Sequence, residues 1–526
     1  MRSPRTTAAA VAAAAVVALF GLVFAFRAAD APRKLPPAPP AARDDPTPPR
    51  PTLPPSSTAA GASTPRYDEK VQYKPTPLPD RVILTWKGDP ARSQAVTWRT
   101  DTTVKAAIAQ VAVAGGGPGF EPGWRGYDAK KVSKIAARTE RLKSAINEAL
   151  YHSVNFEGLT PKTRYVYRVG DGSNWSEWFQ FETASDKPDD FGFIYFGDAQ
   201  NGIRSLWSRV ARGAYSDMPR AKFIVHAGDL VDSGGSDTQW GEWHAAAGWI
   251  NGMVPSVPTP GNHEYGGKVT PHWRAQFTLP ENGPPGQEEY CYYFDYQGVR
   301  VISLHSNEKL TEQAKWVEAV LADNPCRWTV VTFHHPIYSP VAGRDNKAVR
   351  EAWRAVFDRA PKTVDLVLQG HDHTYARSSL MREDNTLSGT QLQTERGTVY
   401  VVSVSGAKLY SAADRTWMVR KGSGLQLYQL IRVSGDRLSY ESKGASGDLY
   451  DAFELSKRDD GGNDLIEREM SLPPESEGGP EPPPAAAPVA AGDRGVRDPG
   501  AAVVAAAILA LVALAVGWAV AGKKPV

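Results

Sequence analysis

The segment from Phe191 to Arg377 contains five short apolar runs, each followed by side chains that bind metals: FIYF (193–196) then Gly197-Asp198, FIV (223–225) before Gly228-Asp229, Val254–Val257 before Gly261-Asn262-His263-Glu264, Trp328–Phe333 before His334-His335-Pro336, and Val364–Leu368 before Gly370-His371-Asp372-His373. Short β-branched and aromatic runs bounded by glycine are typical of buried strands. In layered α/β proteins, ligands collect beyond the carboxyl ends of such strands. The five motifs therefore predict one pocket assembled from distant parts of the chain.

The side chains at these strand ends are carboxylates, one carboxamide and imidazoles, with no thiolate. This donor set suits Fe, Mn or Zn and differs from a structural zinc site closed by cysteines. The candidate ligands are too numerous for one ion. If Asp229 gives one oxygen to each of two cations, the set fits a pair about 3.5–4 Å apart, the arrangement used for in-line attack on phosphorus. The predicted cofactors are two divalent or trivalent metal ions.

Helical patterns separate these strands at residues 205–215, 240–252, 312–323 and 349–360, and a strand meander follows the last motif. The order GD, GD, GNHE, HHP and GHDH resembles that of the calcineurin-like metallophosphoesterases. The sequence GHDHTYAR from Gly370 to Arg377 is similar to the purple acid phosphatases within that superfamily. The resemblance implies an α/β four-layer (α/β/β/α) sandwich for residues 190–456. It also implies a metal-dependent phosphoric ester hydrolase of the acid phosphatase type.

The resemblance assigns the metal ligands position by position. It places the first metal on Asp198, Asp229 and His373, and the second on Asp229, Asn262, His334 and His371. Asp229 would bridge the two ions, and a metal-bridging hydroxide would attack phosphorus in line.

Other residues beside the motifs receive roles from the same resemblance or from strand geometry. His263 would contact the phosphoryl group and protonate the leaving oxygen. Strand alternation would turn only one of two adjacent histidines toward the site. Because the resemblance selects His334 as the ligand, His335 is predicted to lie behind the ligands or at the rim. Glu264 either orients His263, binds a metal or caps the polar end of its strand.

Two positions depart from the family pattern. Purple acid phosphatases place a tyrosine three residues after the Asp of the second motif, and here that position is Asp232. Other metallophosphoesterases place a histidine two residues after the first Asp, and here that position is Gln200. The fourth ligand of the first metal is therefore Gln200, Asp232 or water. Without the phenolate that colours the purple enzymes, we predict a colourless protein whose first site prefers a divalent ion.

Substrate recognition is less well specified by the sequence. The candidate contacts at the rim, for which structural packing is an equal alternative, are Asn201, Tyr265, His335, Tyr375 and Arg377. The predicted partner is a phosphate ester, and the predicted function is a phosphomonoesterase. The alternatives are an extracellular phosphodiesterase or nucleotidase, and a tethered binding protein with an inactive site.

Residues 73–185 show short aromatic and β-branched runs separated by turn residues, which predicts an all-β sandwich. The segment Leu159–Gly170 resembles a fibronectin-like module, and purple acid phosphatases of plant type carry such a module before the catalytic domain. The predicted fold is therefore a fibronectin-like sandwich followed by the metallophosphoesterase domain.

Residues 1–31 combine a basic start, an apolar stretch from Ala8 to Phe26 and the sequence Ala29-Asp30-Ala31. These features are typical of a secretory signal peptide. An uncleaved N-terminal anchor is the alternative, because the apolar stretch is just long enough to span a bilayer. The Pro-rich residues 32–72 are predicted to form a disordered linker.

The composition of residues 457–500 predicts a second disordered linker. Residues 501–521 form an apolar run long enough for a transmembrane helix, and the lysines of the tail, residues 522–526, favour the cytoplasmic side. We therefore expect an exported, membrane-anchored protein with its catalytic domain extracytoplasmic. A formal net charge of +2 gives no support for nucleic acid as a partner.

The chain has only two cysteines, Cys291 and Cys326, and they lack the spacing of a metal motif. An exported chain permits a disulfide. Each cysteine precedes a predicted strand, and neighbouring strands would bring the two together, so a Cys291–Cys326 bond is predicted.

Overall fold

The computed structural model describes residues 68–360, 362, 364–382 and 397–468. The predicted signal peptide or anchor, most of the first linker, residues 469–500 of the second linker, and the predicted helix 501–521 with its tail lie outside these residues. Among the described residues, we find no helix with the length and apolar character needed to cross a membrane.

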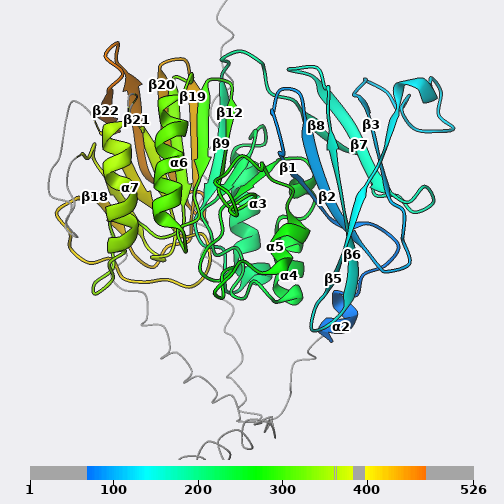
Figure 1. Cartoon of the computed structure of the whole chain (residues 1–526), viewed down its shortest axis with the longest axis horizontal. Helices are drawn as coiled ribbons and strands as arrows, with labels where there is room; N and C mark the ends of the chain where they lie inside the picture. The colour runs from blue at the N-terminus through cyan, green and yellow to red at the C-terminus, as the bar shows by residue number, and fades with distance from the viewer. Residues whose placement is uncertain (1–67, 361, 363, 383–396, 469–526) are drawn as a thin grey trace, which may run out of the picture. The chain divides into compact units, whose positions relative to one another are not determined.

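The N-terminal part of the described chain is a sandwich of two four-stranded antiparallel sheets (Figure 1). Their orders are β1-β2-β6-β5 and β4-β3-β7-β8. The strands are β1 (Asp80–Thr85), β2 (Gln94–Thr100), β3 (Ile108–Val113), β4 (Ser133–Ala136), β5 (Arg138–Lys143), β6 (Glu148–Phe156), β7 (Arg164–Gly170) and β8 (Phe179–Glu182). A core that includes Trp98, Tyr167 and Phe181 fills the space between the sheets.

The predicted β-sandwich is thus confirmed, with two strands that the sequence pattern did not reveal. Strands β4 and β5 are short, rich in Lys and Arg, and mostly exposed, so they lack the apolar alternation on which strand prediction depends. The predicted first linker also extends too far, because Asp68 caps a short helix, α2 (Glu69–Gln72), with its side chain accepting from the Lys70 N–H.

The remainder of the described chain, from β9 onward, contains two seven-stranded sheets. The first has the order β11-β10-β9-β19-β20-β21-β22, and the second has the order β12-β13-β14-β15-β17-β16-β18. The strands of the first are β9 (Phe191–Phe196), β10 (Ile224–His226), β11 (Ser256–Pro258), β19 (Leu427–Ser434), β20 (Arg437–Gly444), β21 (Leu449–Lys457) and β22 (Asn463–Glu467). Those of the second are β12 (Tyr292–Tyr296), β13 (Val299–Ser303), β14 (Trp328–Phe333), β15 (Leu366–Gln369), β16 (Tyr375–Ser378), β17 (Val399–Val402) and β18 (Met418–Gly422).

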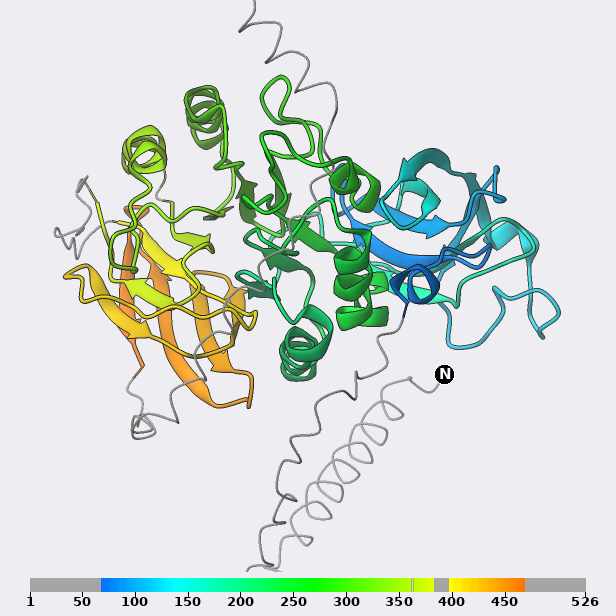
Figure 2. The same cartoon turned by 90° about the horizontal axis from the view of Figure 1, so that it is seen from below.

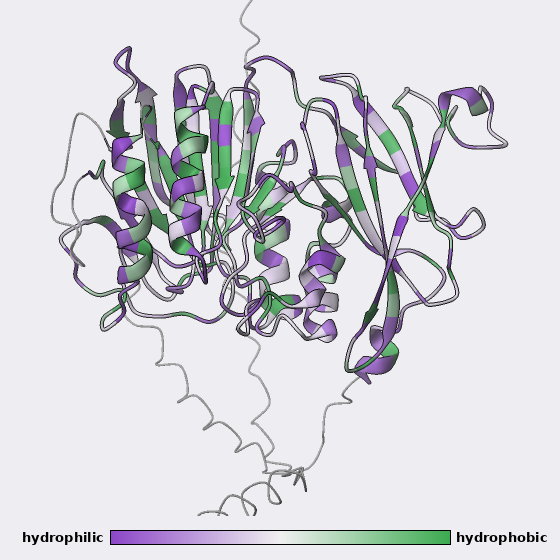
Figure 3. Cartoon of the chain, in the orientation of Figure 1, coloured by the Kyte–Doolittle hydropathy of each residue, from purple (hydrophilic) through white to green (hydrophobic). Residues whose placement is uncertain are grey.

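Helices cover the outer faces of both sheets. In Figure 2, α6 and α7 lie on the outer side of the second sheet. Strands β19 to β21, which belong to the first sheet, lie on the other side of the second sheet. Figure 3 shows apolar residues concentrated on the strands and polar residues on the outer faces of α6 and α7. The helical segments are α3 (Ser208–Asp217), α4 (Asp237–Ala247), α5 (Pro271–Gln276), α6 (Leu310–Ala322) and α7 (Lys347–Arg359), with shorter turns η1 (Ala129–Lys131), η2 (Ile203–Trp207) and η3 (Gly248–Gly252).

Two apolar cores hold these layers together. The larger core contains residues from both sheets, such as Phe193 and Val330, together with Val210 of α3 and Trp243 of α4. The smaller core joins the second sheet to α6 and α7 and includes Trp353. The predicted four-layer order is therefore confirmed, and the four predicted helices coincide with η2–α3, α4–η3, α6 and α7.

The direction of the central strands explains why the motifs meet. Strands β9, β10 and β11 are parallel neighbours, and β13, β14, β15 and β17 are parallel neighbours in the other sheet. Parallel strands end at the same edge of their sheet. The loops after β9, β10, β11, β14 and β15 carry the five motifs, and the two edges face each other.

The domain built on these two sheets extends further than the predicted boundary at residue 456. Strand β22, inside the predicted second linker, pairs with β21 as an antiparallel hairpin. Asn463 and Lys457 both bond the buried carboxylate of Asp365, which directly precedes β15. The polar residues of β22 lack the apolar pattern from which strands are predicted, so the sequence did not indicate this hairpin.

The predicted Cys291–Cys326 disulfide is wrong, because both cysteines are free and buried. Cys291 precedes β12 at the end that pairs with Ser303, the last residue of β13. Cys326 precedes β14 at the end that pairs with Val299, the first residue of β13. The two thiols therefore lie at opposite ends of β13 and on either side of it.

A buried ion-pair cluster joins the sandwich to the catalytic domain. Asp237, in the first turn of α4, has a side chain only 2% exposed. It accepts from Arg81 of β1 at 2.7 Å, from Arg99 of β2 at 3.3 Å and from the Asn147 amide at 2.8 Å. The start of α4 is thus fixed directly to the sheet β1-β2-β6-β5.

Candidate metal centre

Close backbone packing explains two glycines in the motifs. A Cβ on Gly370 would lie 2.6 Å from Asp198 Oδ2, and a Cβ on Gly261 would collide with the carboxylate of Asp229. Asp229 and His371 themselves have φ of 49° and 71°, in the left-handed region that few non-glycine residues adopt. Such conformations concentrate at functional sites. The backbone conformation of these loops therefore brings their candidate ligand atoms close together.

The first group of ligand atoms comes from β9, β10 and β15. Asp198, Asp229 and His373 each offer an atom within 4.8 Å of the others, and all three residues are buried. The Nδ1–H of His373 donates to the Lys408 carbonyl at 2.7 Å, which leaves Nε2 facing Asp198 Oδ1 at 3.4 Å. Burial lowers the pKa of His373 to about 4, so its ring is neutral and Nε2 presents a lone pair.

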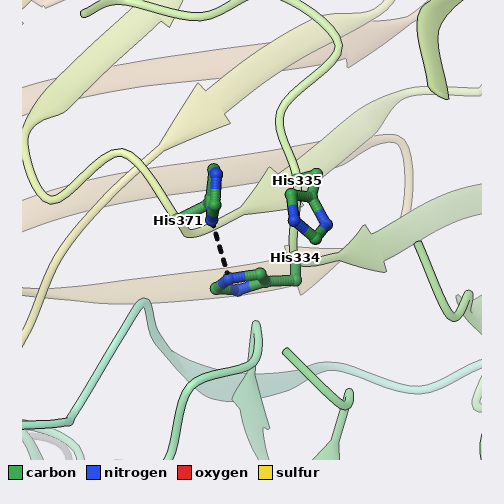
Figure 4. A group of neighbouring side chains, drawn as sticks. All are labelled: His334, His335 and His371. Atoms are coloured by element: carbon green, nitrogen blue, oxygen red, sulfur yellow. Dashed lines mark hydrogen bonds between the residues drawn. The ribbon is translucent and has the colours of Figure 1, made fainter. Parts of the chain in front are cut away.

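The second group surrounds His334. Its Nδ1–H donates to the Ala227 carbonyl at 2.9 Å, so Nε2 is the ring atom that faces the other ligand candidates. That Nε2 lies 3.1 Å from Asp229 Oδ2, 3.0 Å from Asn262 Oδ1 and 3.1 Å from His371 Nδ1. Figure 4 shows the contact between His334 and His371. Acceptor atoms thus converge on one another, an arrangement that a cation stabilises.

The electrostatics of the pocket also favour positive charge. Burial alone would lower the pKa of His334, yet the carboxylates of Asp229 and Asp198 raise it to about 9. Burial and the neighbouring Asp229 charge raise the pKa of Asp198 to about 7. Two carboxylates buried this closely repel each other unless cations lie between them. The residues present therefore fit a metal centre by both donor type and charge.

The structure brings Gln200, and not Asp232, to the first group. Gln200 Nε2 lies 3.2 Å from Asp229 Oδ2 and 2.9 Å from His373 Nε2, while its Oε1 is buried without a hydrogen-bond partner among the described residues. An unpaired buried amide oxygen is costly and is suited to a cation. The Asp232 side chain is 40% exposed and lies beside the ring of His263 instead.

His263 occupies the predicted position at the opening of the pocket. Its Nδ1–H donates to the Asp232 carbonyl at 2.6 Å, and its Nε2 lies 3.8 Å from Asp229 Oδ2. The side chain is 25% exposed. Its Nε2 can therefore face both a bound substrate and solvent.

Glu264 acts on the backbone and not on His263 or a metal. Its carboxylate accepts from the N–H groups of Asp229 at 3.0 Å, Val231 at 3.2 Å and Gly261 at 2.9 Å. Burial and the nearby Asp229 charge raise its pKa to about 8. Of the three predicted roles, the structure supports the capping of polar groups, here from two motif loops at once.

His335 lies closer to the centre than strand alternation predicted. Strand β14 ends at Phe333, so the alternation stops before the histidine pair. His334, His335 and His371 offer ring nitrogens within 4.8 Å of one another, and the rings of His335 and His371 are 4.2 Å apart. His335 Nδ1 is also 2.8 Å from the Ser306 hydroxyl. It therefore borders the second group directly.

Two of the predicted rim residues remain near the motifs. Asn201, next to Gln200, has φ of 65° and a buried Oδ1 without a hydrogen-bond partner in the described part of the chain. The Tyr265 hydroxyl donates to Glu308 at 2.8 Å, and its ring packs on His305 at 5.3 Å.

Of the two alternatives for Tyr375 and Arg377, the structure supports packing and not a place at the rim. Both are buried, at 1% exposure, between the two sheets. The Tyr375 hydroxyl donates to Asp451 of β21 at 2.7 Å, and Arg377 donates to Asp451 and to Glu467 of β22. Their strand, β16, carries them from the motif into the interior, where they cross-link the sheets.

Arg344 was not predicted, although it touches the centre. It lies in the loop between β14 and α7, donates from Nη2 to His371 Nε2, and pairs with Asp372 at 2.9 Å. Its guanidinium also lies over the Tyr410 ring, which packs against His373 at 4.7 Å. The loop has no metal-ligand motif, so sequence spacing alone gave no reason to select it.

Comparison with known proteins agrees with this geometry. Residues 79–183 match the model of the purple acid phosphatase N-terminal domain, and residues 192–375 match that of the calcineurin-like phosphoesterases. Residues 192–375 therefore form a calcineurin-like phosphoesterase domain. The chain as a whole resembles the purple acid phosphatases, since both matched domains occur in the order expected of that group.

Named relatives extend the comparison. The chain is 24% identical over 367 residues to acid phosphatase type 7 of Homo sapiens, covering 63% of this chain and 78% of that protein. It is 24% identical over 359 residues to probable inactive purple acid phosphatase 24 of Arabidopsis thaliana, covering 58% of this chain and 57% of that protein. The chain thus spans little more than half the length of the latter.

A solved structure supports the fold. The purple acid phosphatase PPD1 of yellow lupin (Lupinus luteus) seeds superposes with a TM-score of 0.60 at 20% identity, covering 72% of this chain and 74% of that one. At this identity the likeness concerns the fold.

The loss of the tyrosine ligand leads to a spectroscopic prediction. Asp232 stands where purple acid phosphatases have that tyrosine, and its side chain points to the rim. We expect the metal-loaded protein to be colourless, because no phenolate at this position donates charge to a ferric ion. An absorption spectrum of the purified protein checks this, and a strong visible charge-transfer band would contradict it.

Proposed function

We propose that the protein is a phosphomonoesterase that works with two metal ions. The observation that carries the proposal is the position of Asp229, whose Oδ2 lies 3.1 Å from His334 Nε2 and 3.2 Å from Gln200 Nε2. One carboxylate thus faces both groups of ligand atoms. Asp198, Gln200 and His373 would hold one ion with it, and Asn262, His334 and His371 would hold the other.

When bound, two such ions activate water at neutral pH and neutralise charge on the phosphoryl oxygens. The protein's own residues orient the substrate and move the proton. With Nδ1–H committed to the Asp232 carbonyl, His263 keeps its Nε2 toward the pocket, where the protonated ring can donate to the leaving ester oxygen. The Asp229 carboxylate lies 3.8 Å from that Nε2. The Glu264 carboxylate accepts from the N–H groups of Asp229 and Gly261 and so holds the loops after β10 and β11 together.

Stereochemistry tests the reaction path. The proposed path has a single in-line displacement by water, so hydrolysis of a monoester made chiral at phosphorus with oxygen isotopes and sulfur should invert the configuration. NMR analysis of the thiophosphate product distinguishes the outcomes. Retention would indicate a covalent phosphoenzyme and would overturn direct transfer.

One assay separates the proposed activity from its alternatives. The protein is given p-nitrophenyl phosphate or its bis ester, each with and without added Mn and Zn. A phosphomonoesterase turns over the first substrate faster. Preference for the bis ester would identify a phosphodiesterase, and absence of turnover with both metals bound would identify a binding protein. The retained ligands argue against the last outcome, although three relatives from Arabidopsis thaliana are named as probably inactive.

The proposed location is outside the cytoplasm, with a membrane anchor. It rests on the apolar stretches at 8–26 and 501–521. Fractionation of cells that produce the full chain, followed by protease treatment of intact cells, tests both parts. Recovery in the soluble cytoplasmic fraction would overturn the proposal.

A further inference from the structure

Arg344 is a cation at the edge of the proposed metal centre that the ligand assignment does not use. Its side chain is 29% exposed, so the guanidinium is neither buried in the core nor free in solvent. It donates to His371 Nε2, on the ring edge opposite to the atom that faces Asn262. The guanidinium is therefore one imidazole width away from the second group of ligand atoms.

Asp372 and Tyr410 hold the Arg344 guanidinium in this place. Asp372, between the ligand candidates His371 and His373, is fully buried and pairs with Arg344 Nε at 2.9 Å. The other carboxylate oxygen accepts from the Ser339 hydroxyl at 2.5 Å, which fixes the direction of the pair. Tyr410 lies under the guanidinium at 5.4 Å. The head group is thus pre-organised, which reduces the entropy that binding a ligand would cost.

The ring of His371 determines what the Arg344 N–H groups can bind. Its Nδ1 lies 2.9 Å from Asn262 Oδ1 and 3.1 Å from His334 Nε2, so Nδ1 is the atom available to a cation. An imidazole that binds a metal through Nδ1 carries its proton on Nε2. Two donors would then face each other, and Arg344 Nη2 would need another acceptor.

We propose that this acceptor is a non-bridging phosphoryl oxygen of the substrate, and that Arg344 makes the centre selective for dianionic monoesters over monoanionic diesters. This inference rests on the proposed function, because it places phosphate at the same centre. The guanidinium fork matches the geometry of phosphate oxygens, and charge-assisted bonds of this kind are among the strong ones. A dianion gains more from the added positive charge than a monoanion does.

The test combines direct binding with kinetics on the full metal-loaded chain. Isothermal titration calorimetry measures the affinity for inorganic phosphate, and kcat/KM is measured on p-nitrophenyl phosphate and its bis ester. In Arg344→Ala, phosphate affinity should fall about 10- to 100-fold, the range expected for a lost bond to a charged group. The ratio of monoester to diester kcat/KM should fall at least about tenfold. Arg344→Lys, which can still pair with Asp372, should be intermediate.

Lys347→Ala is the matched control, since Lys347 is a nearby cation whose side chain is 68% exposed and pairs only with exposed Glu351 among the contacts described. It should leave phosphate affinity and the substrate ratio unchanged. Phosphate affinity in Arg344→Ala within about twofold of wild type would overturn the proposal. So would elemental analysis showing fewer metal ions in that variant, because Arg344 would then act through His371. Arg344-dependent phosphate binding without turnover of any ester would refute the proposed function and the ester selectivity, while the contact between Arg344 and phosphate would stand.

Discussion

Replacing Asp229 with asparagine is expected to lower kcat/KM on p-nitrophenyl phosphate by at least about 100-fold, since even changes behind the ligands of a metal site cost about 10- to 100-fold. The carboxylate faces both groups of ligand atoms, and the amide would replace one charged oxygen with an NH₂ donor. Both ions should therefore bind more weakly. Elemental analysis of the dialysed variant should show less than the full pair.

A distant carboxylate provides the control for this change. Asp436 lies in the turn between β19 and β20, is 62% exposed and pairs with Arg327. Asp436→Asn should match the wild type in both activity and metal content. Turnover of Asp229→Asn within about tenfold of wild type, with two ions retained, would show that this carboxylate does not bridge.

Replacing Asp237 with alanine is expected to lower the free energy of unfolding by about 3–5 kcal/mol, the usual cost of breaking a buried ion pair by removing one partner. Arg81 and Arg99, whose side chains are 4% and 2% exposed, would be left in the interior without this carboxylate. Urea unfolding followed by tryptophan fluorescence measures the change. Asp436→Ala, which removes an exposed pair, should cost less than about 1 kcal/mol. A comparable loss in both variants would contradict the assigned role of Asp237.

The same residue should make stability depend on pH. Burial alone would raise the pKa of Asp237, but Arg81 and Arg99 lower it below its ordinary value. A carboxyl whose folded pKa is lowered contributes stability above its unfolded pKa, about 4, and loses this contribution as pH falls through the folded value. Wild-type protein should therefore lose stability below about pH 4 more steeply than Asp237→Asn does.

The sequence allowed the positions of the ligands to be predicted because strand polarity constrains them strongly. Each motif follows a buried strand, and parallel strands place their carboxyl ends at one edge. Asp198, Asp229, His334 and His371 therefore converge whatever the loops do in detail. The layered fold followed from the same alternation of strands and helices.

Other features depended on contacts that local pattern does not encode. Arg377 follows the GHDH motif closely, yet β16 turns it toward Asp451, some seventy positions later in the chain. The cysteines each precede a strand, but the direction of β13 separates them. Arg344 sits in a loop without a motif and reaches the centre only through the fold. Each of these outcomes is decided by tertiary packing, which adjacent residues do not reveal.

The attachment of Asp237 to the sandwich has a consequence for how this architecture can be dissected. Asp237 opens α4 only eight positions after Asp229, and the intervening Gly234 N–H donates to the His263 carbonyl at 2.9 Å. Excision of the first 185 residues would therefore uncover a charged helix start next to the catalytic loops. The sandwich is therefore a structural part of the neighbouring domain and not a detachable accessory, and the two should be transferred and engineered as one piece.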